Sequence, residues 1–351
     1  MNTHLLFRCA SYALCCLVLA VLLDLPAAAQ DLHYTQFYTD ALRLNPAMTG
    51  NFSGDYRLGL NARNQWQSVP VPYRTGSVYA DFVPFKSESR QGTQRWVGTG
   101  LNFLYDAAGD GRLSMLEIRG NAAVHAAFTP NLYVSAGASA AFRQRSIDFS
   151  RLYYGIQWTD DGFDRSPVSQ EDITQQSFGY IDLAAGANLS YQVPQVCNIF
   201  LGASILHLNR PTETFLGNDN RLGTRFALQA GASFALRRLL IEPAAYYTTQ
   251  KRASEWVIGT NIVWQTQGDY KRNGIRESGS KIYAGLWYRW GDAISPLVGM
   301  EWKNYRLLVS YDVNISALQT ASRNRGGLEL SLVHVGVFKK RFRNDIYCPR
   351  F

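Results

Sequence analysis

Polar and apolar residues alternate with a period of two over many segments after residue 55. In residues 56–66, one face of the pattern carries Tyr56, Leu58, Leu60, Ala62 and Trp66, and the other carries Arg57, Asn61, Arg63 and Gln65. Such alternation predicts β-strands, whose successive side chains point to opposite faces. It fits a soluble sandwich with its polar face in water, and also a membrane barrel with its apolar face in lipid and its polar face inside.

Aromatic residues at the ends of the apolar faces favour the membrane barrel. Trp256 and Trp264 bracket one such face, with Ile258 and Ile262 between them. This span matches the roughly 9–11 residues that a tilted strand needs to cross a bilayer. Amphipathic rings are enriched at both water–lipid interfaces. The alternative, that these rings belong to the core of a soluble sandwich, stays open.

Strands of this kind are predicted at residues 55–66, 74–84, 95–106, 112–128, 132–145, 178–193, 198–209, 224–236, 239–249, 255–266, 281–291, 296–303, 305–317 and 326–338. Their even number returns the chain to its starting side, as in bacterial single-chain barrels. Loops after odd-numbered strands are then extracellular, and the longest connection, 146–177, follows the fifth. Connections after even-numbered strands are mostly short, as periplasmic turns are, although 85–94 and 267–280 are longer. We therefore predict an all-β fold, a transmembrane antiparallel outer-membrane β-barrel of about 14 strands over residues 55–338.

The polar face of these strands carries charges of both signs. The predicted inward residues are Arg57, Arg63, Arg225, Glu242, Glu301, Arg306 and Asp312. Opposite charges in a confined space of low dielectric are usually paired, which predicts a crowded lumen rather than a wide pore. Residues 30–54 precede the first strand and are expected to form a plug or a periplasmic arm.

The first 29 residues have the features of a secretory signal peptide. An apolar run from Tyr12 to Leu23 follows Arg8, and small residues at 27–29 end the segment. This run is too short for a membrane-spanning helix, which needs about 20 residues. We predict cleavage after residue 29 and export to the outer membrane.

Composition agrees with an exported, strand-rich protein. Charged residues make up 18% of the chain and aromatic residues 13%, with 29 Gly, which excludes a disordered chain and disfavours a helical bundle. The formal net charge of +8 belongs to the mature protein, because the leader holds one Arg and one Asp. Cys197 and Cys348 remain after cleavage, too few for a disulfide scaffold. Both fall on the predicted periplasmic side, and a disulfide between them is a hypothesis.

The sequence lacks the spacings that common catalytic and metal sites require. His33, His125, His207 and His334 lie on separate segments, without a second ligand at metal spacing. Residues 160–164 resemble half of a calcium loop but lack the glutamate at its twelfth position. The nucleophile elbow, the phosphate-binding glycine loop and the Cys-x-x-Cys pair are also missing from the sequence. We expect no enzyme activity, no metal and no cofactor.

Three motifs of the mature chain are distinctive. The first comprises Gln30–Tyr38, Leu44-Asn45-Pro46-Ala47-Met48-Thr49-Gly50, Asp55-Tyr56-Arg57 and Arg63-Asn64-Gln65-Trp66. The second is His207–Pro211 in the middle of the chain. The third comprises Ser310–Asn314, Gly326–Leu332 and Cys348–Phe351. Together they resemble the PorP/SprF family of Bacteroidetes outer-membrane proteins, which is associated with the type IX secretion system. The resemblance extends over nearly the whole mature chain.

This resemblance implies a barrel that binds proteins and performs no chemistry. Its partners would be periplasmic ring lipoproteins and motor components, or a large secreted adhesin attached at the cell surface, often in gliding bacteria. Residues suited to these contacts are Tyr153, Tyr154, Trp158, Asp160, Asp161 and Phe163 in the extracellular loop, and Lys339, Lys340, Arg341 and Arg343 in the basic tail 339–351.

Other interpretations of these features stay open. The basic tail is either a solvated chain end or a docking patch for an acidic periplasmic partner, and export excludes nucleic acid. The whole protein could instead be a passive outer-membrane transporter for small or hydrophobic solutes. A further alternative for the whole protein is a soluble, exported all-β binding protein.

Overall fold

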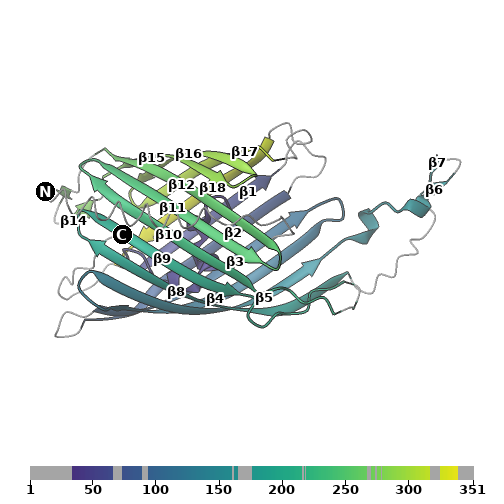
Figure 1. Cartoon of the computed structure of the whole chain (residues 1–351), viewed down its shortest axis with the longest axis horizontal. Coiled ribbons are helices and arrows are strands. Elements are labelled where there is room, and N and C mark those ends of the chain that lie inside the picture. The colour runs from purple at the N-terminus through teal and green to yellow at the C-terminus, as the bar shows by residue number, and fades with distance from the viewer. Residues whose placement is uncertain are drawn as a thin grey trace.

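The structure, a computed structural model, describes residues 34–65, 73–88, 94–159, 162–164, 176–215, 217, 219–266, 270–272, 275–277, 279–316 and 325–338. In these residues, fourteen antiparallel strands close into a barrel whose first strand pairs with its last (Figure 1). The predicted all-β barrel of about 14 strands is confirmed, and the sandwich alternative is wrong. The predicted signal peptide 1–29 and basic tail 339–351 lie outside the described residues.

The barrel strands are β1 (Tyr56–Gln65), β2 (Tyr73–Glu88), β3 (Gln94–Ala108), β4 (Leu113–Ala127), β5 (Leu132–Ser146), β8 (Ser177–Val193), β9 (Cys197–Leu206), β10 (Arg225–Leu236), β11 (Leu239–Gln250), β12 (Ala253–Gln265), β15 (Lys281–Arg289), β16 (Ala293–Trp302), β17 (Tyr305–Asn314) and β18 (Arg325–Gly336). Two separate hairpins are formed by β6 (Trp158–Thr159) with β7 (Gly162–Phe163), and by β13 (Tyr270–Arg272) with β14 (Ile275–Glu277).

The second strand is longer than the sequence predicts. The prediction ended at residue 84, whereas β2 continues to Glu88. Pro84 explains the difference, because proline cannot donate to a strand ladder. Here it lies at a register shift between Phe82 and Phe85 on the β2–β3 ladder, where a bulge accommodates it. Residues 85–88 and 94 of the long connection expected at 85–94 are therefore strand, and residues 89–93 lie outside the described residues.

The two ends of the barrel differ in their connections. The β6–β7 hairpin projects far beyond the barrel at one end, and β14 lies at the opposite end (Figure 1). We call the end with the β6–β7 hairpin the hairpin end, and the end with β14 the turn end. Turn-end connections include Lys303–Asn304 between β16 and β17, with φ angles of 49° and 67°. Such left-handed residues form the tight turns that match the twist of antiparallel strands.

The outer face of the barrel is apolar, and aromatic side chains lie near both of its ends. Val78 and Leu101 are 52% and 65% exposed in the middle of this face. On β12, Trp264 lies toward the turn end and Trp256 toward the hairpin end. Extended apolar surfaces are rare on soluble proteins, and aromatic belts are favoured at membrane interfaces. The outer face is therefore suited to lipid. Across the described ranges, no helix is both long and apolar enough to span a membrane.

Residues 34–50 lie inside the barrel, and we call them the luminal segment. Their elements are the 3₁₀ turns η1 (Phe37–Asp40) and η2 (Pro46–Met48) and, between these, the single helical turn α2 (Ala41–Leu44). Thr35, Leu42 and Ala47 are completely buried. The segment leads into β1 at the turn end, while Thr35 bonds to Asp312 near the hairpin end of β17. It therefore crosses the lumen lengthwise.

Candidate functional site

Glycines on the inner wall let the luminal segment contact the strands directly. A Cβ atom on Gly137 of β5 would lie 2.5 Å from the carbonyl carbon of Pro46, and one on Gly98 of β3 would collide with the carbonyl of Thr49. Side chains do not approach backbone this closely, so only glycine fits where the two backbones meet.

Asn45 occupies the narrowest part of this contact. Its side chain lies against Gly186 of β8 and Gly202 of β9, and a Cβ on Gly202 would be 2.9 Å from the Asn45 Nδ2. The amide Nδ2 donates to the carbonyl of Ala187 (3.1 Å), and Oδ1 accepts from the backbone N–H of Ala47 (3.0 Å). We call Gly98, Gly137, Gly186 and Gly202 the glycine cradle. The Asn-Pro-Ala motif thus lies against glycines of three strands, β5, β8 and β9, while Gly98 of β3 receives Thr49.

His125 of β4 holds the end of the luminal segment. Its Nε2 lies 2.8 Å from the carbonyl of Thr49 and its Nδ1 lies 2.7 Å from the hydroxyl of Ser135. The imidazole stacks on Trp96 with ring centroids 4.7 Å apart, and the Trp96 indole N–H donates to the carbonyl of Gly50 (2.9 Å). This histidine therefore binds backbone of the luminal segment.

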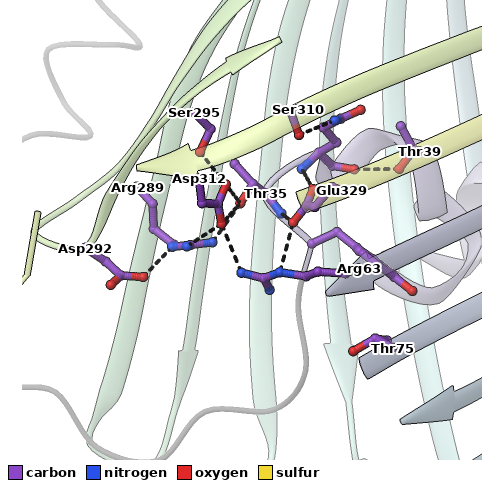
Figure 2. A network of polar contacts seen from close by, with 12 residues as sticks. Thr35, Thr39, Arg63, Thr75, Arg289, Asp292, Ser295, Ser310, Asp312 and Glu329 are labelled. Atoms are coloured by element: carbon purple, nitrogen blue, oxygen red, sulfur yellow. Dashed lines mark hydrogen bonds and ion pairs between the residues drawn. The ribbon is translucent and has the colours of Figure 1, made fainter. Parts of the chain in front are cut away.

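Two carboxylates near the hairpin end bind the first described residues of the chain, as Figure 2 shows. The backbone N–H groups of Thr35 and Gln36 donate to the two oxygens of Glu329 on β18, at 2.8 and 3.2 Å. The Thr35 hydroxyl donates to Asp312 on β17 (3.0 Å). The segment is thus held through backbone groups as well as side chains.

Two guanidinium groups balance these carboxylates. Arg63 of β1 contacts Asp312 and Glu329, each at 3.1 Å. Arg289 of β15 donates to Asp312 (2.9 Å) and to the Thr35 hydroxyl (2.7 Å). We call these four charged residues with Thr35 the anchoring network. A buried ion needs an oppositely charged partner. The two guanidinium groups and two carboxylates of this network provide such partners for one another.

The seven charged side chains predicted to face the lumen lie on the inner wall, and several form ion pairs. Arg57 donates to both carboxylate oxygens of Asp81, at 2.9 and 2.8 Å. Glu301 accepts from Arg306 (2.9 Å) and from Lys281 (2.7 Å). The prediction of charge pairing inside the barrel is confirmed at these positions. Asp81 also accepts from the backbone N–H of the luminal segment at residue 50 (2.8 Å).

A small cavity remains beside Tyr38. It measures about 80 Å³ and is lined by Glu242, Tyr283, Trp287 and Arg306, among others. Binding sites for small molecules usually occupy roughly 300–1,000 Å³. This cavity is too small for a substrate of that size, and Tyr38 of the luminal segment forms part of its lining.

A second charged cluster lies between the lumen and the hairpin end. Arg119 of β4 donates to Glu117 (2.9 Å) and to Asp182 of β8 (3.1 Å), and Arg143 of β5 donates to Glu117 (2.5 Å). His207, directly after β9, lies 2.8 Å from Asp182 through its Nδ1. All five side chains are at most 1% exposed. We call these five residues the buried charge cluster. Through His207, the cluster holds the first residue of the connection between β9 and β10.

This connection, residues 207–224, packs onto its neighbours. The side chain of Asn209 forms hydrogen bonds of 3.1 and 2.6 Å with two backbone groups of β8. The ring of Phe215 packs edge-on against Phe178 (4.7 Å between centroids) and Phe149 (6.4 Å). The hairpin end is therefore a packed platform.

The β6–β7 hairpin extends from this platform and exposes aromatic rings. Tyr153, Trp158 and Phe163 are 59%, 69% and 40% exposed. Phe163 lies 5.3 Å from Tyr153 and 5.4 Å from Trp158 between ring centroids. Tyr154, predicted with them, donates instead to a backbone carbonyl of η3 (Phe149–Arg151) at 3.3 Å. Of the predicted client-binding residues, Asp160 and Asp161 lie outside the described residues.

Of the remaining predicted site residues, the structure describes Cys197 alone. Cys197 is buried at the start of β9, whereas Cys348 lies outside the described residues, so a disulfide between them stays a prediction. Lys339, Lys340, Arg341 and Arg343 also lie outside them. Among the residues that the structure describes, no three His, Cys, Asp or Glu side chains gather as a metal site requires.

Comparison with known proteins identifies the family. The chain is similar in structure to the toluene transporter TbuX of Ralstonia pickettii (12% identity, TM-score 0.45, covering 84% of this chain and 92% of that one). It is also similar to a FadL homologue of Pseudomonas aeruginosa (9% identity, TM-score 0.46, covering 83% and 92%). No curated protein matches the sequence. A family model described as type IX secretion system membrane protein PorP/SprF matches residues 27–333. The chain belongs to the PorP/SprF family of type IX secretion system membrane proteins.

Proposed function

We propose that the protein is a closed, non-enzymatic outer-membrane barrel that holds a large secreted adhesin for the type IX secretion system. In this proposal residues 1–29 direct export, the hairpin end faces the cell exterior, and the turn end faces the periplasm. The observation that carries the proposal is the filled lumen. Residues 34–50 are seated in the glycine cradle and tied to the anchoring network, which favours binding over solute transport.

The lengths of the connections support this orientation. Extracellular loops of outer-membrane barrels are long, and periplasmic turns are short. The connections 147–176 and 207–224 both belong to the hairpin end, whereas Arg237–Arg238 and Lys303–Asn304 belong to the turn end.

The hairpin end has the properties of a protein-binding surface. Exposed aromatic side chains supply most of the binding energy in many protein interfaces, and a rigid base lowers the entropy lost on binding. Tyr153, Trp158 and Phe163 provide such rings, and the buried charge cluster with the packed 207–224 connection provides a fixed base. The proposed client is a large adhesin, as family membership suggests.

The turn end is suited to an acidic periplasmic partner. Arg237, Arg238 and Lys303 are exposed there, and β18, which ends there, is followed in the sequence by the basic residues of 339–351. Clustered positive charge attracts acidic protein surfaces. Ring lipoproteins of the secretion machinery are the proposed partners.

Removing the exposed rings should release the client. We expect the double substitution Trp158→Ala with Phe163→Ala to lower the amount of adhesin retained at the cell surface by at least about tenfold, because loss of aromatic anchors of this kind typically costs 2 kcal/mol or more. Retained adhesin is measured by surface labelling and by mass spectrometry after capture of the barrel from detergent-solubilised membranes.

Trp302→Ala is the matched control, since Trp302 is 54% exposed but lies at the turn end. It should leave adhesin retention unchanged. Normal retention by the double variant, with the barrel present at its usual level, would contradict the proposed client site. Loss of ring lipoproteins from the same captured sample would instead indicate that the hairpin serves the periplasmic machinery.

A further inference from the structure

The barrel closes at the seam between β1 and β18. Among the described barrel strands, every other neighbouring pair follows directly in chain order, so a connection joins its two members. The seam has no such connection, because β1 begins the barrel and β18 ends it. Its ladder runs from Tyr56 opposite Gly336 to Gln65 opposite Gly327.

The luminal segment binds strands on both sides of this seam. On one side, Thr35 contacts Glu329 of β18 and Asp312 of β17. On the other side, the Asn61 amide of β1 donates to the carbonyl of Thr39 (3.4 Å). Residues 34–39 therefore bridge the first and last strands from inside the barrel.

The anchoring network also crosses the seam. Arg63 of β1 lies directly opposite Glu329 of β18 in the ladder and contacts it at 3.1 Å. Glu329 receives two further hydrogen bonds from the backbone of Thr35 and Gln36. At the hairpin end of β18, Gly326 and Gly327 contribute no side chains that could pack against β1. On the luminal face of this part of the seam, the polar network thus adds side-chain contacts to the backbone ladder.

We infer that the luminal segment is a latch for the seam. While residues 34–39 are bound, the hairpin-end half of the β1–β18 ladder stays closed, and release of these residues permits local opening there. Local opening of a protein is governed by the contacts that the opening element loses. Here the contacts belong to a segment that is covalently continuous with β1 and bound to β18. This inference does not depend on the identity of any client.

Hydrogen exchange of the full-length barrel in detergent tests the latch. Thr35→Val removes the hydroxyl that joins Asp312 and Arg289 while keeping the shape of the side chain. We expect backbone amides in the hairpin-end half of the β1–β18 ladder, residues 61–65 and 327–331, to exchange roughly tenfold faster, the size expected for losing a hydrogen bond to a charged group. Amides of β9 and β10, which lie across the barrel from the seam, should keep their exchange rates. Thr35→Ser retains the hydroxyl and should behave as the unsubstituted chain.

Equal acceleration around the whole barrel, or unchanged seam rates in Thr35→Val, would overturn the inference. If Thr35→Val does not assemble into a folded barrel, Gln36→Leu removes the hydrogen bond to Ser310 on β17 (2.5 Å) and is tested in its place. A disulfide engineered across the seam by Asn64→Cys with Leu328→Cys, which are paired in the ladder, should abolish the acceleration. Its persistence in the cross-linked barrel would also overturn the latch.

Discussion

Replacing Arg119 with methionine should lower the free energy of unfolding by about 3–5 kcal/mol, the usual cost of removing one partner from a buried ion pair. Arg119 is fully buried, and its guanidinium contacts Glu117 at 2.9 Å and Asp182 at 3.1 Å. Methionine fills much of the same space but leaves both carboxylates with fewer donors. The measurement is the midpoint of guanidinium-induced unfolding in detergent, followed by tryptophan fluorescence.

Arg151→Met is the control for this experiment. Arg151 and Asp148 form an ion pair of 2.9 Å, but both side chains are about half exposed. Hydrogen bonds from Ser150 lower the pKa of Asp148, with a further contribution from Arg151. Exposed pairs contribute little to stability, so this variant should keep the original midpoint. If Arg119→Met kept it too, the buried charge cluster would not be needed to hold the hairpin end together.

Deleting residues 34–50 should convert the closed barrel into a conducting one. The segment is buried along its length and occupies the space between opposite walls. Without it the inner wall would present the charged groups of Arg57, Asp81 and the anchoring network to water. A 14-stranded barrel with a polar wall is wide enough for a small aqueous path. Discrete conductance steps in planar bilayers would be the readout, with silence expected from the full-length barrel.

Single glycine substitutions show whether conductance arises because the luminal segment is displaced or because the barrel wall is damaged. Gly137→Leu places a side chain where the backbone of Pro46 now lies and should produce conductance without deletion. Gly120→Leu is matched to it, because a Cβ there would have no neighbour closer than 3.9 Å. It should stay silent. Conductance by the unsubstituted barrel would refute the closed lumen and favour the passive transporter.

The strands are the part of the structure that the sequence predicts best. Their alternation reflects a strong local constraint, since one face meets lipid and the other meets a polar interior. The segment predicted at 255–266, for example, became β12 (Ala253–Gln265). Prediction was weaker where a residue acts against its usual preference, as Pro84 does inside β2.

The contents of the lumen were much harder to predict. The sequence left residues 30–54 as either a plug or a periplasmic arm, because short 3₁₀ turns produce no periodic pattern. The glycine cradle had no local signal either. Gly137 and Gly186 resemble ordinary strand glycines until the backbone that approaches them is known.

The buried charge cluster was missed for a related reason. Glu117 and Arg119 lie on the same face of β4, so their inward direction could have been read from the alternation. Their partners Arg143 and Asp182 are on other strands, and only strand pairing brings them together. The pattern thus predicts that a charge faces inward, but it does not predict which charge it meets.

The enclosed position of the luminal segment also sets an order for assembly. The N–H of Thr35 bonds to a carboxylate 294 positions later in the sequence, and Arg63 pairs with one 249 positions later. Contacts this distant along a chain form slowly, because a long loop must first be closed. Thr35 and Arg63 therefore acquire these partners only after residues 312 and 329 have been made. The bonds of Thr35 to β17 and β18 therefore belong to a late stage of folding, when the last two strands of the barrel are in place.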